Sequence, residues 1–384
     1  MRIVQIGPYP LSKDCIHGGV EASVYGLTQE LVRTNEVHVF DFPRIDGLDE
    51  IESDGNTLIH RFQNKGKRQM SMTSQVKRIA DEIEHLKPSV CHIHGTGLYS
   101  RVLYQALKQR GLRVIVTVHG LVMVEKLNAL KKHFGLKLLA QFLYQSWSEI
   151  RLLAQLPIAI VDTEYVKEKV DRYPIHNKPR MCVIPQGVNE AFFSLQCSNK
   201  TRTLLSIGAI GERKGHLLTL KAYEIVCRQG IEANLVIAGA IADSNYLKQL
   251  QSAIEESEFK NEITLHLNVP NETLKRLYEN AHLFVLHTQE ESQGIVFGEA
   301  MATGLPIVTT QVGGVPFVVQ DGVTGLLSEY GDVNAFAHNI MSLLNDDIRW
   351  AALSEASRSL ACNYHWAVVG KKVLELYCDL CFFN

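Results

Sequence analysis

The chain has 384 residues, with 39 Lys or Arg against 41 Asp or Glu, so its formal net charge is −2. This near-neutral balance argues against a nucleic-acid-binding protein, which would carry a strongly basic face. With 46% hydrophobic and 21% charged residues, the composition excludes a disordered or collagen-like chain. The length is enough for about two domains.

The first residues and the cysteines bear on location and metal binding. No stretch reaches about 18 uninterrupted apolar residues, and residues 1–10 lack the basic segment and long apolar run of a signal peptide. We therefore expect a cytoplasmic protein that does not span the membrane. The eight cysteines are scattered, which favours reduced thiols. Cys378 and Cys381 alone have ligand-like spacing, and no second pair accompanies them.

Short apolar runs rich in β-branched residues alternate with longer amphipathic segments along the chain. Such runs are typical of strands in a parallel sheet that is covered by helices on both faces. The first series of predicted strands comprises residues 2–7, 36–41, 90–94, 113–119, 157–163 and 181–185. The second series comprises residues 203–208, 234–239, 262–267, 282–287 and 305–310. The sequence therefore predicts two doubly wound, Rossmann-like α/β lobes.

Residues 186–201, which end in the polar sequence CSNKT, are the best candidate for a linker between the lobes. We expect one lobe over residues 1–188 and the other over residues 189–364. Ligands of open α/β sheets bind outside the carboxyl ends of the strands. If the lobes face each other across a cleft, the residues that directly follow the strands should line it.

The densest signal lies in residues 287–312, where a loop that carries Glu291 follows a predicted strand. A helix is predicted over residues 294–303, with Gly304 as its C-terminal stop. Glu299 would lie on that helix and lean toward its N-terminus, where a carboxylate can accept both hydrogens of a vicinal diol. We expect Glu291 to be free to meet sugar hydroxyls. By themselves, two glutamates at this spacing also fit surface carboxylates that the helix dipole favours.

The N-terminus of the same helix is a second feature of this region. The backbone N–H groups of Gly294, Ile295 and Val296 would have no partner within the helix, which makes them donors for an anion or a hydroxyl.

This region resembles the family 4 glycosyltransferases of the GT-B fold. Residues 290–308, EESQGIVFGEAMATGLPIV, are similar to the family's two glutamates eight residues apart followed by EAMA-x-G-x-P-V. Further segments similar to the family are VGGVPFVVQDGVTGLL, VIPQGVNEAFF and HGGVEASVYGLTQEL. The resemblance covers most of the chain. It implies a retaining transferase that uses a nucleotide-sugar, with an acceptor-side N-terminal lobe and a nucleotide-sugar-binding C-terminal lobe.

The C-terminal sequence NYHW resembles the start of the family's last helix, which crosses back to the first lobe in the GT-B fold. By this resemblance, residues 365–384 are assigned to the first lobe.

Two positions depart from the family pattern. Gln293 stands where the family usually has Phe, and Ala209 stands where it has an early Arg. The family's Lys-Gly pair survives as Lys214 and Gly215, and Arg213 is the candidate for the second cation.

Cations at this point have a chemical purpose. Cleavage of the anomeric C–O bond leaves negative charge on the diphosphate while the sugar passes through an oxocarbenium-like state. Arg213 and Lys214 would stabilise that charge in place of a metal ion, and no Asp-x-Asp motif follows a predicted strand of the lobes, so no metal is expected. The amides of Gly18 and Gly19 would add hydrogen-bond donors. A solvated turn at residues 213–214 and a structural turn at residues 18–19 are the alternatives.

Other candidates depend on the resemblance. His119 ends a strand as TVHG, and the family has a similarly placed His that contacts the transferred sugar. His92 and His94 have the same strand-end placement, but a His-x-His pair also suggests a metal site, and no third ligand is evident. Residues 268–274, NVPNETL, resemble the loop that packs on the nucleotide base, where Val269 would offer backbone contacts. An ordinary helix-entry loop with Asn271 as cap remains the alternative there.

Residues 121–156 combine apolar residues at near-helical spacing with five cations and only two acids, Glu125 and Glu149. A basic amphipathic helix binds anionic membranes, which would suit a lipid-linked acceptor and a location at the inner face of the membrane. A helix that covers the N-terminal sheet is the other explanation. The cations are Lys126, Lys131, Lys132, Lys137 and Arg151.

The resulting functional hypothesis is transfer of a sugar from a nucleoside-diphosphate sugar to a hydroxyl acceptor, in the synthesis of a polysaccharide, glycolipid or other glycoconjugate. A nucleotide-sugar epimerase or hydrolase of the same fold is one alternative. An inactive subunit that retains nucleotide-sugar binding is another, which Ala209 and Gln293 favour. A nicotinamide-dependent enzyme is disfavoured, because no G-x-G-x-x-G follows the first strand of either lobe.

Overall fold

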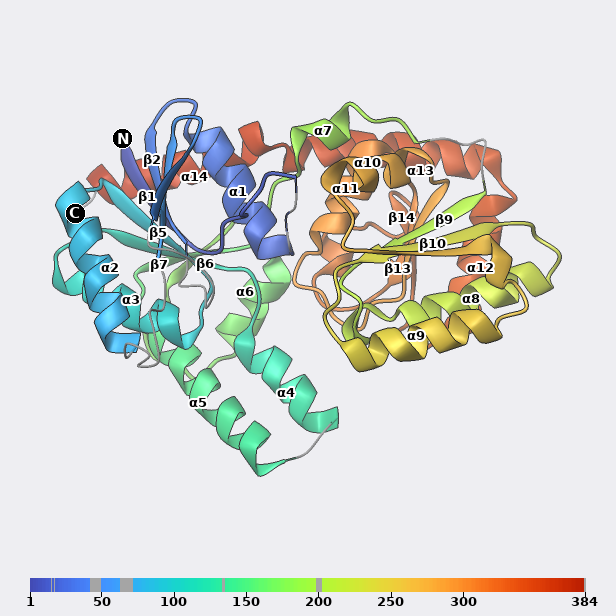
Figure 1. Ribbon diagram of the computed structural model, residues 1–384, viewed down its shortest axis with the longest axis horizontal. Helices are drawn as coiled ribbons and strands as arrows, with labels where there is room; N and C mark the ends of the chain where they lie inside the picture. Colours follow the sequence, from blue (N-terminus) through green and yellow to red (C-terminus); the bar gives the residue numbers. More distant parts are fainter. Residues whose placement is uncertain are drawn as a thin grey trace. The chain divides into compact units, whose positions relative to one another are not determined.

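The computed structural model describes residues 1–14, 16, 18–41, 50–62, 72–132, 135–197 and 202–382. The chain forms two compact α/β units, each built on a largely parallel sheet (Figure 1). The predicted fold class is therefore confirmed. Unit 1 comprises residues 1–9, 20–185 and 369–384, and unit 2 comprises residues 10–19 and 186–368. Cys15, His17 and the end of the predicted linker, residues 198–201, lie outside the described residues.

The sheet of unit 1 has the strand order β3-β4-β2-β1-β5-β6-β7-β8. Its neighbours run parallel, apart from the antiparallel hairpin of β3 and β4. All six strands predicted in this part of the chain are present. The bounds are β1 (Arg2–Ile6), β2 (Glu36–Phe40), β3 (Glu50–Asp54), β4 (Thr57–Arg61), β5 (Val90–His94), β6 (Val114–Val118), β7 (Ile158–Val161) and β8 (Arg180–Val183).

The hairpin of β3 and β4 was not predicted. The strand β3 lies at the edge of the sheet, and its sequence EIESD has one apolar residue, Ile51, which is exposed. An edge strand needs no apolar face, and charged residues there discourage pairing with other chains. Its sequence therefore carries no apolar run.

The helices of unit 1 cover both faces of its sheet. A core of residues such as Val4, Ile93 and Val116 packs against α2, α3, α5 and α6, whereas Val24 of α1 packs with Val39 on the other face. Helices α4 and α5 form a hairpin that extends away from the sheet (Figure 1). The bounds are α1 (Gly19–Leu31), α2 (Met72–Leu86), α3 (Leu98–Gln109), α4 (Val122–Lys132), α5 (Leu136–Leu153), α6 (Glu164–Asp171) and α14 (Trp366–Phe382), whose residues from Val369 belong to unit 1.

The sheet of unit 2 is entirely parallel, with the order β11-β10-β9-β12-β13-β14. All five predicted strands are present, and the short strand β14 was missed. The bounds are β9 (Thr203–Ile207), β10 (Asn234–Gly239), β11 (Ile263–Leu267), β12 (Leu283–Leu286), β13 (Ile307–Thr310) and β14 (Gly325–Ser328).

Alternate residues of these strands enter two separate cores. Leu204 and Val285 belong to the core formed with α8, α9 and α12, and Leu205 and Phe284 belong to the core formed with α10 and α11. Because both faces are buried, the strands are continuous apolar runs. The bounds are α7 (Glu190–Phe193), α8 (His216–Arg228), α9 (Ser244–Glu256), α10 (Asn271–Glu279), α11 (Ile295–Thr303), α12 (Val333–Leu344) and α13 (Asp347–Ala361).

Within the described part of the chain, no helix has the length and apolar character that a transmembrane span requires.

Candidate active site

The site of unit 2 lies where its strand order reverses. From β9 the chain proceeds outward through β10 and β11, and it then returns to place β12 on the other side of β9. Open α/β sheets bind ligands at such a reversal, outside the carboxyl ends of the strands. The loop after β9 carries Arg213 and Lys214, and the loop after β12 carries Glu291.

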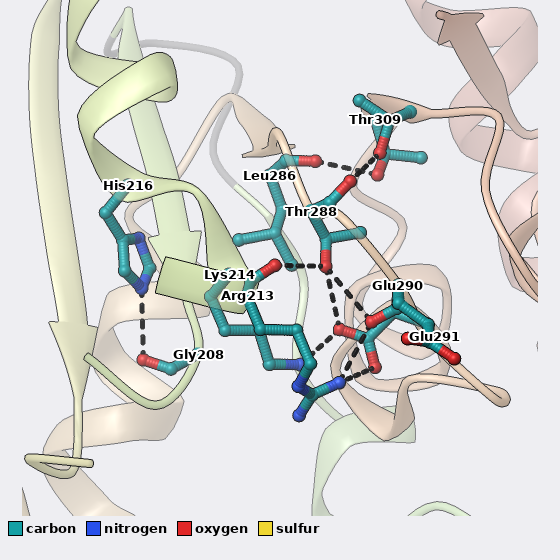
Figure 2. Close-up of polar contacts among 10 residues, drawn as sticks. Gly208, Arg213, Lys214, His216, Leu286, Thr288, Glu290, Glu291 and Thr309 are labelled. Carbon is teal, nitrogen blue, oxygen red and sulfur yellow. Dashed lines mark hydrogen bonds and ion pairs between the residues drawn. The ribbon is translucent and has the colours of Figure 1, made fainter. Parts of the chain in front are cut away.

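The side chains of Arg213 and Lys214 both contact that of Glu291 (Figure 2). The Lys214 ammonium pairs with Oε1 of Glu291, and Nη1 of Arg213 lies 3.3 Å from Oε2. The Thr288 hydroxyl donates to Oε1 at 3.1 Å. Glu291 is 4% exposed, whereas the Arg213 side chain is 51% exposed. The arrangement combines a buried ion pair with a guanidinium that remains accessible to solvent.

The environment keeps Glu291 ionised. Burial by itself would raise the pKa of this carboxyl, but the adjacent Lys214 and Arg213 outweigh burial and lower it. Both oxygens of Glu291 are thus engaged by protein groups, and its contact with sugar hydroxyls stays a prediction. The physical reason is that a buried carboxylate requires charged or hydrogen-bonding partners, and this one has both.

Backbone contacts hold the two loops together. The carbonyl of Arg213 accepts from the backbone N–H of Gln289 at 2.8 Å, and it lies 3.1 Å from the Thr288 hydroxyl oxygen. Gly215 has φ +63°, and a Cβ there would lie 2.0 Å from the carbonyl oxygen of His287. Only glycine fits such a close approach in the left-handed region. The close packing of the two loops therefore explains why glycine follows Lys214.

His216 anchors the beginning of the β9 loop from the start of α8. Its Nε2 lies 3.2 Å from the Gly208 carbonyl oxygen (Figure 2). Its Nδ1 lies 3.1 Å from the Ser206 hydroxyl oxygen. Burial lowers the pKa of His216 to about 4, so the ring is neutral at pH 7 and serves as a structural hydrogen-bonding group.

Helix α11 spans Ile295–Thr303, so it begins one residue later than predicted and has Gly304 at its C-cap, as predicted. Gly294 precedes it with φ +77°, and no side chain of the described residues caps it. The first-turn amides, including those of Ile295 and Val296, therefore have no partner within the helix. Glu299 accepts a 2.8 Å hydrogen bond from the hydroxyl of Tyr278, a residue of α10.

Glu299 differs from Glu291 in its partners and its pKa. Burial raises the pKa of Glu299 to about 7, against a smaller lowering effect of the Tyr278 hydrogen bond. Its carboxyl therefore exchanges a proton close to neutrality. Tyr278 was missed by the sequence analysis, since a buried Tyr in a helix has no local signal that separates it from a core residue.

Gln293 replaces the family's Phe with polar pairing. Its Oε1 accepts a 2.7 Å hydrogen bond from the backbone N–H of Gln186, and its Nε2 donates to the backbone carbonyl oxygen of Gln186 at 3.1 Å. The Gln293 side chain is 1% exposed. It thus ties the segment that follows β8 to the loop before α11, so the loop does not lack support.

The predicted glycines and Val269 lie elsewhere in unit 2, with Gly19 as the first residue of α1. Gly18 has φ +91°, and a Cβ at Gly19 would lie 4.0 Å from Cγ2 of Ile295, so Gly19 adjoins the start of α11. Val269 lies between β11 and α10. Helix α10 has Pro270 at its N-cap position, so the alternative of a cap at Asn271 was wrong.

His119 belongs to a buried network in unit 1. Its Nε2 lies 2.9 Å from Nδ1 of His94, and its Nδ1 lies 3.4 Å from Oδ2 of Asp162. The network of polar contacts continues with Nε2 of His94, which lies 2.6 Å from Oε1 of Gln5. His92 contacts the Tyr377 hydroxyl at 2.6 Å. Both ring nitrogens of His119 thus face protein groups, and its contact with a sugar stays a prediction.

A metal site was not expected from the sequence. Across residues 1–382, apart from the undescribed positions, no group of three or more His, Cys, Asp or Glu side chains is arranged to hold a metal ion. His92 and His94 instead take part in the hydrogen bonds described above.

Comparisons with known proteins identify the family and the fold of the chain. The family model "Glycosyltransferase Family 4" matches residues 17–192, and "Glycosyl transferases group 1" matches residues 188–360. The chain is 27% identical to D-inositol 3-phosphate glycosyltransferase of Corynebacterium urealyticum, over 60% of this chain and 59% of the relative. It is 26% identical to the enzyme of that name from Thermobispora bispora, over 80% and 74%. The match thus spans under two thirds of the first relative's length.

Solved structures of similar fold cover the whole chain. Sucrose-phosphate synthase from Thermosynechococcus elongatus has a TM-score of 0.82 at 18% identity, with complete coverage of both chains. Anabaena HepE in complex with UDP-glucose has a TM-score of 0.74 at 14% identity, with 99% and 100% coverage. At these identities the likeness establishes the two-lobed fold.

Proposed function

This chain belongs to the family 4, group 1 glycosyltransferases of the GT-B fold, which take a sugar from a nucleotide-sugar, and we propose that it performs this transfer to a hydroxyl acceptor with retention of the anomeric configuration. The observation that carries the proposal is the cluster of Arg213, Lys214 and Glu291 where the strand order of unit 2 reverses.

The cluster suits the departure of a nucleoside diphosphate. As the anomeric C–O bond breaks, Arg213 and Lys214 stabilise the charge that develops on the phosphate oxygens. Preorganised donors of this kind each contribute about 3 kcal/mol to a transition state. Glu291 orients the two cations through its own contacts with them. In this proposal it is a positioning residue, a role that differs from the one expected from sequence.

Helix α11 supplies the remaining contacts to the donor. The amides of Gly294, Ile295 and Val296 face an anion or a hydroxyl, with Gly18 and Gly19 in an adjoining segment. Ionised Glu299 accepts hydrogen bonds from the ribose diol, and its pKa of about 7 makes this binding sensitive to pH near neutrality. The backbone at Val269 lies beside the base.

The similar proteins and the basic segment of unit 1 suggest which donor, acceptor and location to test. HepE is described in complex with UDP-glucose, so a UDP-sugar is the first donor to test. The relatives named D-inositol 3-phosphate glycosyltransferase make a phosphorylated polyol one acceptor to test. A glycan or a lipid-linked carrier is the acceptor class expected from the sequence. We place the protein in the cytoplasm, with a peripheral contact of residues 121–156 at the inner face of the membrane.

Thermal-shift measurements with UDP-, GDP- and ADP-sugars test donor binding, since a ligand that binds only the native state raises the melting temperature. Turnover with the donor so identified then compares the wild type with Lys214→Ala and Glu299→Ala. We expect both variants to lose at least 100-fold in turnover, by analogy with the loss of one oxyanion-hole donor. Near wild-type turnover in both would refute the site.

Two alternatives give different products. Isomerised or free sugar formed from the donor in stoichiometric amounts without acceptor indicates an epimerase or hydrolase. A donor-induced rise in melting temperature without any product, across the acceptors tested, indicates an inactive binding subunit. Arg213 in place of the family's early Arg is examined by Arg213→Ala in the same assay.

A further inference from the structure

Helix α5 carries an exposed apolar stripe on the hairpin that extends away from the sheet of unit 1 (Figure 1). Leu136, Leu143, Tyr144 and Trp147 are 81%, 58%, 52% and 45% exposed. At 100° per residue, these four positions fall within an arc of about 100° on one side of the helix. The four side chains are called the α5 stripe below.

The opposite side of α5 is the side that packs on unit 1. Its buried residues are Ser146, Ser148, Glu149, Leu152 and Leu153. The α5 stripe is thus separate from the face of the helix that packs on the rest of unit 1. A contiguous row of large apolar side chains at a protein surface is a mark of an interaction site, whereas single exposed apolar residues are ordinary.

Positive charge borders the α5 stripe. Lys137 and Arg151 are exposed on the same helix. The guanidinium of Arg101, from α3, lies 4.7 Å from the centre of the Trp147 ring, and that of Arg151 lies 5.8 Å from it.

The acidic residue of α5 does not offset these cations at the surface. Glu149 is fully buried and accepts from the Thr96 hydroxyl at 2.6 Å and the Tyr173 hydroxyl at 3.2 Å. It also accepts from the amides of Val122 and Met123 at 3.0 and 2.9 Å, which fixes the start of α4. The expectation that Glu149 opposes the basic residues of the hairpin was therefore wrong.

We propose that the α5 stripe docks on the surface of a bilayer that contains anionic lipids. Trp and Tyr favour the membrane interface because their rings are apolar with one polar edge. The leucines enter the acyl boundary, and Lys137, Arg151 and Arg101 meet the anionic head groups. The inference deepens the proposed peripheral location and rests on it, but it does not depend on the sugar-transfer chemistry. It assigns the contact to named side chains of α5.

Docking through this surface has a consequence for the loop after β6. Glu149 joins α5 to the first residues of α4, and two residues separate His119 from the start of α4. The membrane-bound helix and the loop that carries His119 are thus held as one assembly within unit 1. A lipid-linked acceptor would be presented close to that loop.

The test is co-sedimentation of the full chain with vesicles of phosphatidylglycerol and phosphatidylcholine, or of phosphatidylcholine alone, at low salt. We expect the wild type to bind the anionic vesicles and the Leu136→Glu/Leu143→Glu variant to bind at least tenfold less. Lys137→Glu/Arg151→Glu should lose the preference for anionic lipid. Ile51→Glu, which alters an apolar side chain of unit 1 that is 66% exposed, is the matched control and should bind like the wild type.

Several outcomes would overturn the inference. These are no sedimentation of the wild type with anionic vesicles, an equal loss in Ile51→Glu, or a dimer that Leu143→Glu dissociates, which would make a second copy the occupant of the stripe. Far-ultraviolet circular dichroism and melting temperature verify that each variant is folded. The donor-induced thermal shift should be the same in the wild type and in Leu136→Glu/Leu143→Glu, so a failure of donor binding is distinguishable from a failure of docking.

Discussion

At the scale of single residues, the ion pair of Lys214 and Glu291 is the most exacting feature of the site. Removing one partner of a buried pair leaves an uncompensated charge, and we expect Lys214→Met to lower the free energy of unfolding at pH 7 by about 3 kcal/mol. This is the low end of the usual range, because Arg213 and Thr288 continue to contact Glu291. Urea denaturation measures the effect.

The matched double variant isolates the pair. Lys214→Met/Glu291→Gln removes both charges, so its loss should be smaller than that of Lys214→Met alone. Lys167→Met removes the ammonium of an exposed pair with Glu164 and should change stability by no more than about 0.5 kcal/mol. A double variant whose free energy of unfolding is lower than that of Lys214→Met would contradict the description of the pair.

The second residue-scale prediction concerns Glu299 and pH. Its pKa in the folded protein is about 7, against 4.5 in a model peptide. Between these values the folded state binds more protons than the unfolded state, so stability falls as pH rises. Relative to Glu299→Gln, we expect the wild type to lose at most about 3 kcal/mol between pH 4.5 and 7.

Tyr278→Phe provides the complementary measurement. The Tyr278 hydrogen bond lowers the pKa of Glu299, so its loss should move the pH dependence toward higher pH. Urea denaturation at several pH values measures the free energy of unfolding of each variant. A shift toward lower pH, or a wild type whose stability relative to Glu299→Gln does not change with pH, would show that the pKa of Glu299 is not raised in the folded protein.

At the scale of elements, Gln293 connects the segment after β8 to the loop before α11. Gln293→Leu has a similar volume but leaves the amide and carbonyl of Gln186 without the two hydrogen bonds observed. We expect a loss of about 2 kcal/mol, since an unsatisfied buried polar group costs 1–3 kcal/mol. Chemical denaturation measures it, and Gln289→Leu in the neighbouring half-buried position is the control, with a smaller loss.

At the scale of the whole molecule, each unit has its own apolar core. Domains with separate cores can unfold separately, so calorimetry is expected to show two transitions. A nucleotide-sugar at 100 times its Kd should stabilise unit 2 by about 2.7 kcal/mol and raise the transition of that unit. A donor that raises only the transition of unit 1, assigned by limited proteolysis, would contradict the location of the donor site.

Much of this protein was determined by its sequence alone. The fold class and the strands predicted from apolar runs are present, because a strand buried on both faces must be apolar throughout. The end of α11 at Gly304 was also predicted, because glycine readily adopts the positive φ that a helix C-cap often requires. The edge hairpin of β3 and β4 and the short β14 gave no comparable signal.

Only the tertiary structure decided which side chains meet. Lys214 and Glu291 are 77 residues apart, and they make contact because β9 and β12 are neighbours in the sheet. Gln293 and Gln186 are 107 residues apart, and the partner of Glu299 comes from another helix. Local periodicity specifies the type of each element and the residues at its ends. The order in which strands assemble, and hence the partner and pKa of a buried carboxylate, depends on packing between distant segments.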